Sequence, residues 1–99
     1  MKYYKLAYSE QAKGDLRELR KHIEEKLKLP LTAQRYTNGI SNVIRQLKTD
    51  ADLRQVDEVA SHRFGYEVHR VNYKKMAILY EIDGEIVYIV RVVPQSIIW

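Results

Sequence analysis

The sequence predicts an α+β domain in which a helical hairpin packs on one antiparallel sheet. Two apolar stripes with helical spacing occupy the first half of the chain, and three strand-like segments occupy most of the second half. A further strand-like segment precedes the helices, so the predicted order is β-α-α-β-β-β. A length of 99 residues is enough for one domain only, which we assign to residues 1–99.

The first strand and the first helix are predicted from two different periods. Residues 2–8 are rich in tyrosine and alternate along the chain, which is typical of a strand. Ser9 follows as a plausible N-cap, and the residues after it form an amphipathic helix over residues 10–28. The apolar stripe of this helix is Ala12, Leu16, Leu19, Ile23 and Leu27.

A second helix is predicted over residues 32–48, after Pro30 has separated it from the first. Its apolar stripe is Ala33, Tyr36, Ile40, Val43, Ile44 and Leu47. Gly39 lies inside this helix and lowers its helix propensity by up to ~1 kcal/mol relative to alanine, so we expect close contact with the first helix there. The two helices then form an antiparallel hairpin whose apolar stripes face the sheet.

The second half of the chain is predicted to be mostly strands. Residues 49–62 have no sustained period and are interpreted as a loop with room for a short turn of helix. The predicted strands are residues 64–71, 76–82 and 85–93, with a polar turn at residues 72–75 and a type I′ turn at Asp83-Gly84. The last strand is apolar on nearly both faces, so it should be covered on both, and Pro94 ends it.

The composition excludes several kinds of chemistry. The chain has no cysteine, so disulfides, thiolate metal sites and cysteine nucleophiles are excluded. No glycine-rich phosphate loop or Gly-x-Ser-x-Gly elbow occurs, and the three histidines lack metal-ligand spacing, so we expect no metal and no cofactor. There is neither a long apolar run nor a leader-like start, so we expect a cytoplasmic protein that does not enter membranes.

The charge is concentrated in the first half of the chain. The net charge is +4, and residues 1–50 hold 11 Lys and Arg against 6 Asp and Glu. Such an excess favours an acidic partner or nucleic acid, although an ordinary solvated helix surface would look the same.

Basic residues interleaved with tyrosines mark the strand-rich half of the chain as a candidate binding surface. Arginine and lysine beside aromatic side chains suit RNA, and they equally suit a protein interface. The candidate target-binding residues are Arg63, Arg70, Lys74, Lys75, Arg91 and Trp99. An alternative is that Arg70 and Arg91 only pair across strands, with Glu67, Glu81 or Glu85 as partners.

Several of these segments together resemble the RelE/ParE superfamily, the toxins of bacterial type II toxin–antitoxin modules. Residues 12–16, Ala-Lys-Gly-Asp-Leu, with Leu19, His22 and Ile23 after them, look like the Ala-x-x-Asp-Leu-x-x-Ile run of that family. Residues 76–84 resemble its Tyr-x-Ile-x-Tyr hairpin, and residues 87–93 resemble its last core strand. The resemblance covers nearly the whole chain and implies the same β-α-α-β-β-β fold.

The resemblance implies one of two activities, each neutralised by a cognate antitoxin. RelE-like members cut messenger RNA on the ribosome, and ParE-like members poison DNA gyrase. RelE-like nucleases commonly have arginine where this chain has Ala77, and an acid–base residue where it has Pro94-Gln95-Ser96. Alanine cannot stabilise a phosphorane and glutamine is a poor general acid, so these departures favour the ParE-like, non-enzymatic reading.

Two alternatives stay open from the sequence. The chain is an endoribonuclease with a non-standard catalytic set, for which His69, Arg70 and Arg91 are the candidates. Otherwise it is a small basic binding module with no toxin role. The implied partners are thus an antitoxin together with DNA gyrase, or with the ribosome and its messenger RNA.

Overall fold

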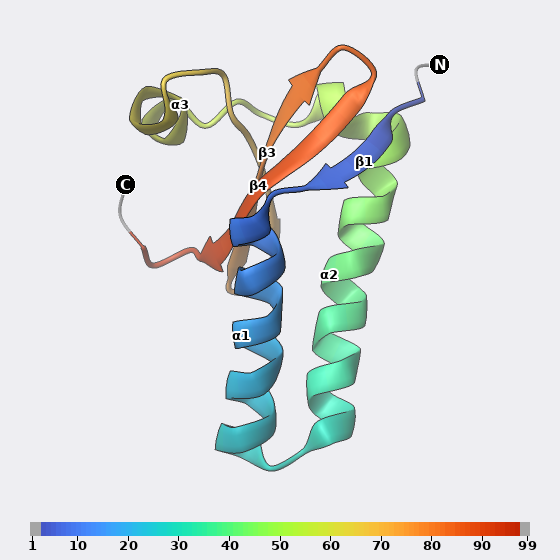
Figure 1. Cartoon of the computed structure of the whole chain (residues 1–99), viewed down its shortest axis with the longest axis vertical. Helices are drawn as coiled ribbons and strands as arrows, with labels where there is room; N and C mark the ends of the chain where they lie inside the picture. Colours follow the sequence, from blue (N-terminus) through green and yellow to red (C-terminus); the bar gives the residue numbers. More distant parts are fainter. Residues whose placement is uncertain (1–2, 98–99) are drawn as a thin grey trace.

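The computed structural model describes residues 3–97, and it confirms the predicted β-α-α-β-β-β order, with a 3-10 helix and a short α-helix added between α2 and β2 (Figure 1). The elements are β1 (Lys5–Tyr8), α1 (Glu10–Leu27), α2 (Pro30–Asp50), the 3-10 helix η1 (Ala51–Leu53), α3 (Glu58–Phe64), β2 (His69–Tyr73), β3 (Met76–Asp83) and β4 (Ile86–Pro94). Within residues 3–97, no helix is both long and apolar enough to cross a membrane.

The sheet is mixed, so the prediction of an antiparallel sheet is wrong for one strand. The strand order is β1-β4-β3-β2, with β2, β3 and β4 forming an antiparallel meander. The first strand lies at the edge and runs parallel to β4, from Lys5 opposite Ile86 to Tyr8 opposite Ile89. Whether β1 runs parallel or antiparallel to β4 depends on the end of the sheet at which β2 begins after the long connection from α2. No local pattern in the sequence indicates which end that is.

The first helix is held at both ends by local signals. Ser9 caps it by accepting a hydrogen bond from the Ala12 N–H at 2.9 Å. The Ser9 hydroxyl also donates to the Val90 carbonyl oxygen at 2.7 Å, so the start of α1 is fixed to β4. Lys28 adopts a left-handed conformation after α1, and Pro30 then begins α2, two residues earlier than predicted.

The main core lies between the helical hairpin and the sheet. Its largest fully buried side chains come from α2, β3 and β4: Ile40, Ile44, Leu47, Ile78, Tyr80, Val87 and Ile89. On α1, Ala12 is fully buried, whereas Leu16 and Leu19 are only partly buried against this core. The hairpin extends past the sheet in Figure 1, which explains why Ile23 is only partly buried; the side chain of Leu27 lies outside the described part.

Gly39 makes a different contact from the one predicted. A Cβ atom at this position would overlap the ring and hydroxyl group of Tyr73 on β2. The close approach is therefore between α2 and the sheet, not between α2 and α1. Tyr36, on the same helix, meets the Tyr73 ring edge-on with centroids 5.4 Å apart.

Residues 49–68 are more helical than predicted. The second helix continues to Asp50, and η1 and α3 follow where a loop was expected. Asp57 caps α3 through the Ala60 N–H, and Gly65, with φ at 81°, ends it. Because Phe64 belongs to α3, the strand predicted over residues 64–71 begins only at His69.

Both tight turns of the meander lie at slightly different residues from those predicted. The β3–β4 turn is Gly84-Glu85, and of these two residues only the glycine has a positive φ, at 61°. This is the pattern of a type II′ turn and not of the predicted type I′ turn. The β2–β3 turn is Lys74-Lys75, with Lys74 left-handed at φ 52°.

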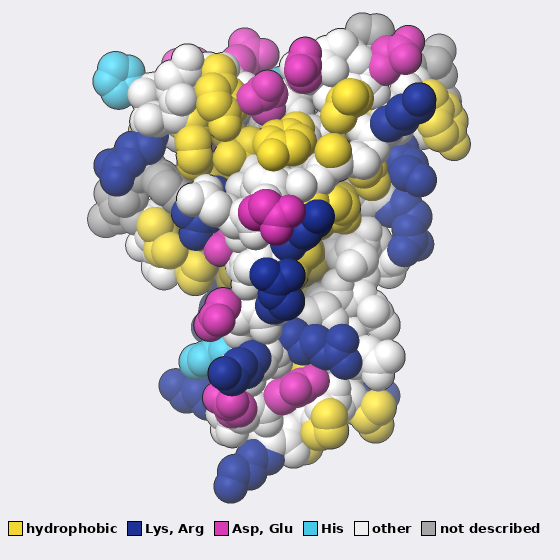
Figure 2. Space-filling model, viewed as in Figure 1, with side chains coloured by type: hydrophobic (Ala, Val, Ile, Leu, Met, Phe, Trp, Pro, Cys, Tyr) yellow, Lys and Arg dark blue, Asp and Glu magenta, His cyan; other side chains and the backbone are white. Residues whose placement is uncertain are grey.

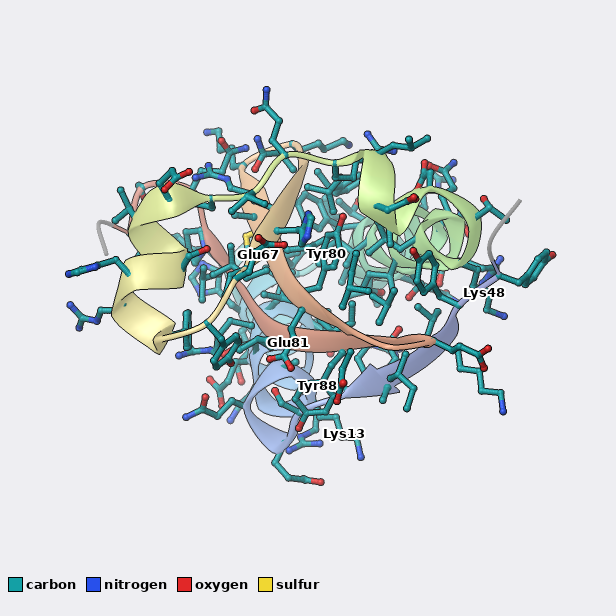
Figure 3. All side chains as sticks on the ribbon, turned by 90° about the horizontal axis from the view of Figure 1, so that it is seen from above. Lys13, Lys48, Glu67, Tyr80, Glu81 and Tyr88 are labelled. Atoms are coloured by element: carbon teal, nitrogen blue, oxygen red, sulfur yellow. The ribbon has the colours of Figure 1, made fainter. Side chains whose placement is uncertain are left out.

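The face of the sheet away from the hairpin is only partly covered. Figure 3 shows Tyr80 on one side of β3, and Glu81 and Tyr88 pointing from the other. Helix α3 covers that second side near Leu79 and Val93, where a small cluster is buried with Ala60 and Val68. Ile86 and Tyr88 of β4 remain exposed, so the prediction that both faces of this strand are covered holds only for its second half.

Candidate target-binding surface

The β2–β3 turn and the segment after β4 form one basic end of the molecule. The Gln95 backbone N–H donates to the Lys75 carbonyl oxygen at 2.8 Å, and its side-chain amide donates to the Lys74 carbonyl oxygen at 2.6 Å. The Lys74 ammonium lies 5.5 Å from the ring centroids of both Tyr36 and Tyr73. The structure therefore places Lys74 beside two aromatic rings, of which Tyr73 belongs to the strand-rich half and Tyr36 comes from α2.

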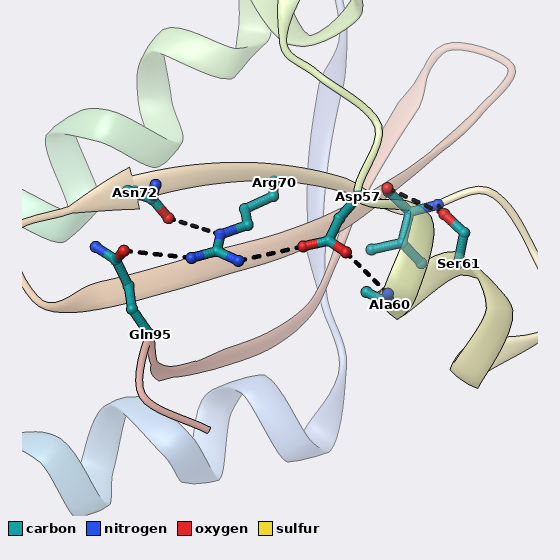
Figure 4. Close-up of polar contacts among 7 residues, drawn as sticks. Asp57, Ala60, Ser61, Arg70, Asn72 and Gln95 are labelled. Atoms are coloured by element: carbon teal, nitrogen blue, oxygen red, sulfur yellow. Dashed lines mark hydrogen bonds and ion pairs between the residues drawn. The ribbon is translucent and has the colours of Figure 1, made fainter. Parts of the chain in front are cut away.

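Arg70 belongs to a polar network that reaches this end (Figure 4). Its guanidinium donates to Asn72 at 2.8 Å, to the Gln95 amide oxygen at 3.2 Å and to Asp57 at 3.3 Å. The other oxygen of Asp57 accepts the Ala60 N–H at 2.9 Å. Arg70 therefore joins β2, the segment after β4 and the start of α3, while its side chain keeps about a third of its surface exposed.

Arg91 is engaged inside the molecule. Its guanidinium makes two hydrogen bonds to the Asp15 carboxylate of α1, at 2.7 and 3.0 Å, and the same carboxylate accepts the Val92 N–H at 2.9 Å. These bonds raise the pKa of Arg91, against the opposing effect of burial. We call this contact the Asp15 clasp, and it holds α1 against β4 just beyond the point where β1 ends.

The expectation that glutamates pair with these two arginines is wrong. The observed partners are Asp57 and Asp15, neither of which lies on a strand. In the sequence, Asp15 is a helical residue beside the apolar stripe, and Asp57 precedes a seven-residue helix by one position. An N-cap pattern could have identified Asp57, whereas no local signal connects Asp15 with a residue 76 positions later.

His69, Arg70 and Arg91 do not converge on one point. His69 is buried and stacks on the Tyr80 ring with centroids 5.3 Å apart, and its Nδ1 lies 3.0 Å from the Arg54 carbonyl oxygen. Successive strand residues point to opposite faces, so Arg70 lies on the other side of the sheet from His69. Arg70 and Arg91 are both in register with Leu79, which puts their backbones about 10 Å apart across β3.

The remaining predicted site residues lie elsewhere. Arg63 is on the last turn of α3, where it lines a shallow hollow with Glu58, Val59 and His62. That hollow shares no lining residue with the hollow beside Lys74 and Lys75. Trp99 lies outside the described residues. Of the six candidates, the structure thus brings Lys74 and Lys75 together, with Arg70 linked to them through Gln95.

Few side chains on and around β3 could act as an acid or a base. Ala77 is buried on β3 between Asn72 and Val93, its register partners. The Tyr80 hydroxyl donates to the Ala51 carbonyl oxygen at 2.7 Å, and burial raises the pKa of Tyr80 strongly. Among residues 3–97, no group of three or more histidines and carboxylates is placed to hold a metal ion.

A four-stranded mixed sheet that carries a helical hairpin is the arrangement that the resemblance to RelE/ParE toxins implied. The family model of the ParE toxin of the type II toxin–antitoxin system parDE matches residues 6–99, so the chain belongs to that family. Among solved structures, the chromosomal ParDE toxin–antitoxin system from P. aeruginosa has the same fold. The TM-score is 0.77 at 18% sequence identity, covering 93% of this chain and 96% of the other. No curated protein matches the sequence.

Proposed function

We propose that this ParE-family toxin acts in the cytoplasm by binding DNA gyrase, without cutting RNA, and that a cognate antitoxin neutralises it. The observation that carries the proposal is that Arg91 is held inside the molecule while the nuclease positions lack acid–base groups. Arg91 is bound by Asp15, and Ala77 is a buried methyl group.

Cleavage of RNA at the 2′-hydroxyl needs a base, a cation for the phosphate and an acid for the leaving oxygen, all within reach of one phosphate. His69 is buried on the hairpin side of the sheet and cannot share a phosphate with Arg70 on the opposite side. Gln95 stands at the position of a general acid, but an amide has no proton to give at neutral pH. These features support a binding function over catalysis.

We assign the target contact to the basic end formed by Lys74, Lys75 and Arg70. A cluster of cations beside two tyrosine rings speeds the encounter with an acidic surface and supplies aromatic contact area once it is bound. Arg63 on α3 would add a second contact, and Trp99 a third. Arg91 acts indirectly, because its role is to hold α1 on β4.

The proposal for the partner rests on the family and on charge. The similar structure from P. aeruginosa is described as a ParDE toxin–antitoxin system. This chain has a net charge of +4 and a pI near 9.3, which suits an acidic antitoxin segment. The antitoxin would be the product of the adjacent gene.

The test compares two target assays on the purified protein. We expect inhibition of gyrase supercoiling and no cleavage of ribosome-bound messenger RNA. Replacing Lys74 and Lys75 with alanine together should weaken gyrase inhibition at least ~10-fold, whereas Lys5→Ala, at the other end of the sheet, should not.

Cleavage in the ribosomal A site that disappears in His69→Ala or Arg70→Ala would overturn the gyrase proposal in favour of a nuclease. A protein that affects neither target and does not slow growth when expressed would instead be a binding module without a toxin role.

A further inference from the structure

The free end of the helical hairpin is strongly basic and is distant in sequence from the basic end that holds Lys74 and Lys75. We call residues 26–35, which join the last turn of α1 to the first turns of α2, the hairpin tip. The tip contains three Lys and Arg and no Asp or Glu, so its net charge is +3. Figure 1 shows it beyond the edge of the sheet, where neither the sheet nor α3 covers it.

The cations of the tip are Lys26, Lys28 and Arg35, and all three residues are exposed. In the described part of the chain, none of them forms an ion pair with a carboxylate. Arg20, farther from the end of α1, differs because it pairs with Glu24 at 3.1 Å. The charge of the tip is therefore available to an anionic ligand.

Apolar side chains lie among these cations. Leu29 is 53% exposed and Leu31 is 67% exposed, and Pro30 between them is exposed as well. Leu31 and Arg35 are four residues apart on α2, so they lie on the same side of that helix. Figure 2 shows hydrophobic side chains at the free end of the hairpin, with Lys and Arg side chains around them. The tip thus suits a ligand that offers both negative charge and apolar surface.

Duplex DNA offers both of these properties. Its phosphates attract lysine and arginine, and proteins that bind its minor groove often insert leucine or proline side chains between base steps. A lipid surface fits less well, because two leucines bury too little apolar area for more than marginal attachment. DNA is also the polyanion nearest to a toxin that is bound to gyrase, since that enzyme works on duplex DNA.

We propose that the hairpin tip binds duplex DNA without sequence specificity. Lys26, Lys28 and Arg35 contact phosphates, and the leucines of the tip rest in the minor groove. The Lys74 ammonium of the basic end lies 5.5 Å from the ring centroid of Tyr36, the residue after Arg35, so the two basic surfaces adjoin. In the complex with gyrase, which this inference takes from the proposed function, the basic end holds the enzyme while the tip holds its DNA.

The cations are tested by the salt dependence of binding, with the purified protein and a short fluorescent DNA duplex of mixed sequence in an anisotropy titration. Three phosphate contacts predict that the logarithm of the affinity falls against the logarithm of the salt concentration with a slope of about −3. We expect Lys28→Ala to make this slope shallower by about 1 and to weaken binding ~3-fold at low salt. Lys5→Ala, which removes the same charge from an exposed residue of β1, is the matched control and should change neither quantity.

The leucines are tested without any change of charge. Replacing Leu29 and Leu31 together with alanine should weaken DNA binding ~5-fold and leave the salt slope unchanged, because only apolar contact is lost. The matched control is Leu53→Ala on η1, where the side chain is 78% exposed, and it should bind DNA like the wild-type protein.

The link with gyrase is tested with Lys26 and Lys28 both replaced by alanine. We expect this variant to inhibit supercoiling of plasmid DNA ~5-fold less strongly than the wild-type protein does, while it binds purified gyrase equally tightly when DNA is absent. Weaker binding to gyrase without DNA would place the tip on the enzyme and overturn the proposal.

The outcomes separate the tip from the proposed function. If the wild-type protein does not bind the duplex, or if Lys28→Ala leaves the slope unchanged, the DNA contact is wrong and gyrase inhibition stands on its own assay. If Lys75→Ala makes the slope shallower and Lys28→Ala does not, DNA lies on the basic end and the tip proposal fails. If the tip binds DNA but the protein does not inhibit gyrase, the DNA contact stands and the proposed function fails. Binding to phosphatidylglycerol vesicles without binding to the duplex would assign the tip to a lipid surface instead.

Discussion

The two faces of the sheet are stabilised in different ways. Toward α1 and α2, large apolar side chains such as Ile44 and Tyr80 fill a continuous core. Toward α3, the buried cluster is small, and α3 contributes only Ala60 to it as a fully buried side chain. Polar contacts contribute much of the attachment of α3 to the sheet. Asp57 caps the helix, and the Val68 N–H donates a hydrogen bond to the Ser61 hydroxyl oxygen at 2.7 Å.

This difference explains where the candidate surface lies. The hairpin face of the sheet is covered by packed apolar side chains. Few polar groups lie on it, and those such as the Tyr80 hydroxyl make hydrogen bonds inside the molecule. The α3 face and the ends of β2 and β4 leave charged and aromatic side chains at the surface. Figure 2 shows one side of the molecule, on which hydrophobic side chains collect over the half that holds the sheet, while the hairpin below it carries many charged ones.

The largest difference between the faces should come from truncating one buried aliphatic side chain on each. Ile44→Ala on α2 and Leu79→Ala on β3 both remove fully buried groups, and such changes cost roughly 2–5 kcal/mol of the unfolding free energy. We expect Ile44→Ala near the top of that range and Leu79→Ala near the bottom, since the small cluster under α3 can collapse more easily. Equal losses in urea denaturation would contradict the comparison.

The next test concerns the contact between α2 and Tyr73. Gly39→Ala places a methyl group against the Tyr73 ring, and overpacking of this kind costs about 1–3 kcal/mol. In a Tyr73→Ala background the same change should instead stabilise the protein by up to about 1 kcal/mol, because alanine favours the helix. A loss of the same size in both backgrounds would mean that the glycine is needed for another reason.

A smaller effect is expected on the α3 face, from Asp57. Asp57→Ala removes both the cap of α3 and the partner of Arg70, and loss of a cap costs about 0.5–2 kcal/mol. Asp57→Asn keeps a capping oxygen and removes only the ion pair with Arg70, which should cost under about 1 kcal/mol. If the two variants lose the same stability in thermal unfolding, the ion pair and not the cap holds α3.

The smallest expected effect is a change in the slope of stability against pH, which appears only at alkaline pH. The pKa of Tyr80 is raised in the fold by burial, so its contribution to stability is complete below pH 10, the ordinary pKa of tyrosine, and is lost as the pH rises above it. We expect the unfolding free energy of the wild-type protein to fall more steeply above pH 10 than that of Tyr80→Phe. Tyr8 and Tyr66, whose pKa values are also raised, should leave a residual slope in both proteins.

Much of the hairpin face could be predicted from the sequence, because its signals are local and repeated. The stripes that contain Leu16 and Ile44 recur with a helical period, and Pro30 marks the boundary between the helices. The α3 face could not be predicted in the same way. Helix α3 has seven residues, with only one of them buried, so its local signals are the Asp57 cap before it and Gly65 after it, with no apolar stripe between them.

The residues of the candidate surface also differ in whether a local sequence pattern could predict their role. Lys74 and Lys75 were identifiable because a polar turn between two strands holds them next to each other. The partners of Arg70 and Arg91 were not, because Asp57 and Asp15 are brought to them by tertiary packing across 13 and 76 positions of the chain. Residues whose role depends on a distant partner leave no periodic trace in the sequence.

The place of β4 in the sheet has a consequence for synthesis of the protein. This strand is central in the sheet, and it pairs with β1 across 81 positions of the chain. Contacts this distant in sequence close slowly, and they cannot begin before both partners have left the ribosome. The basic end is built from the β2–β3 turn and the segment after β4, so a nascent chain lacks it until residues 86–95 have emerged. The protein thus acquires its binding surface in a single step that follows the emergence of β4, and not gradually during translation.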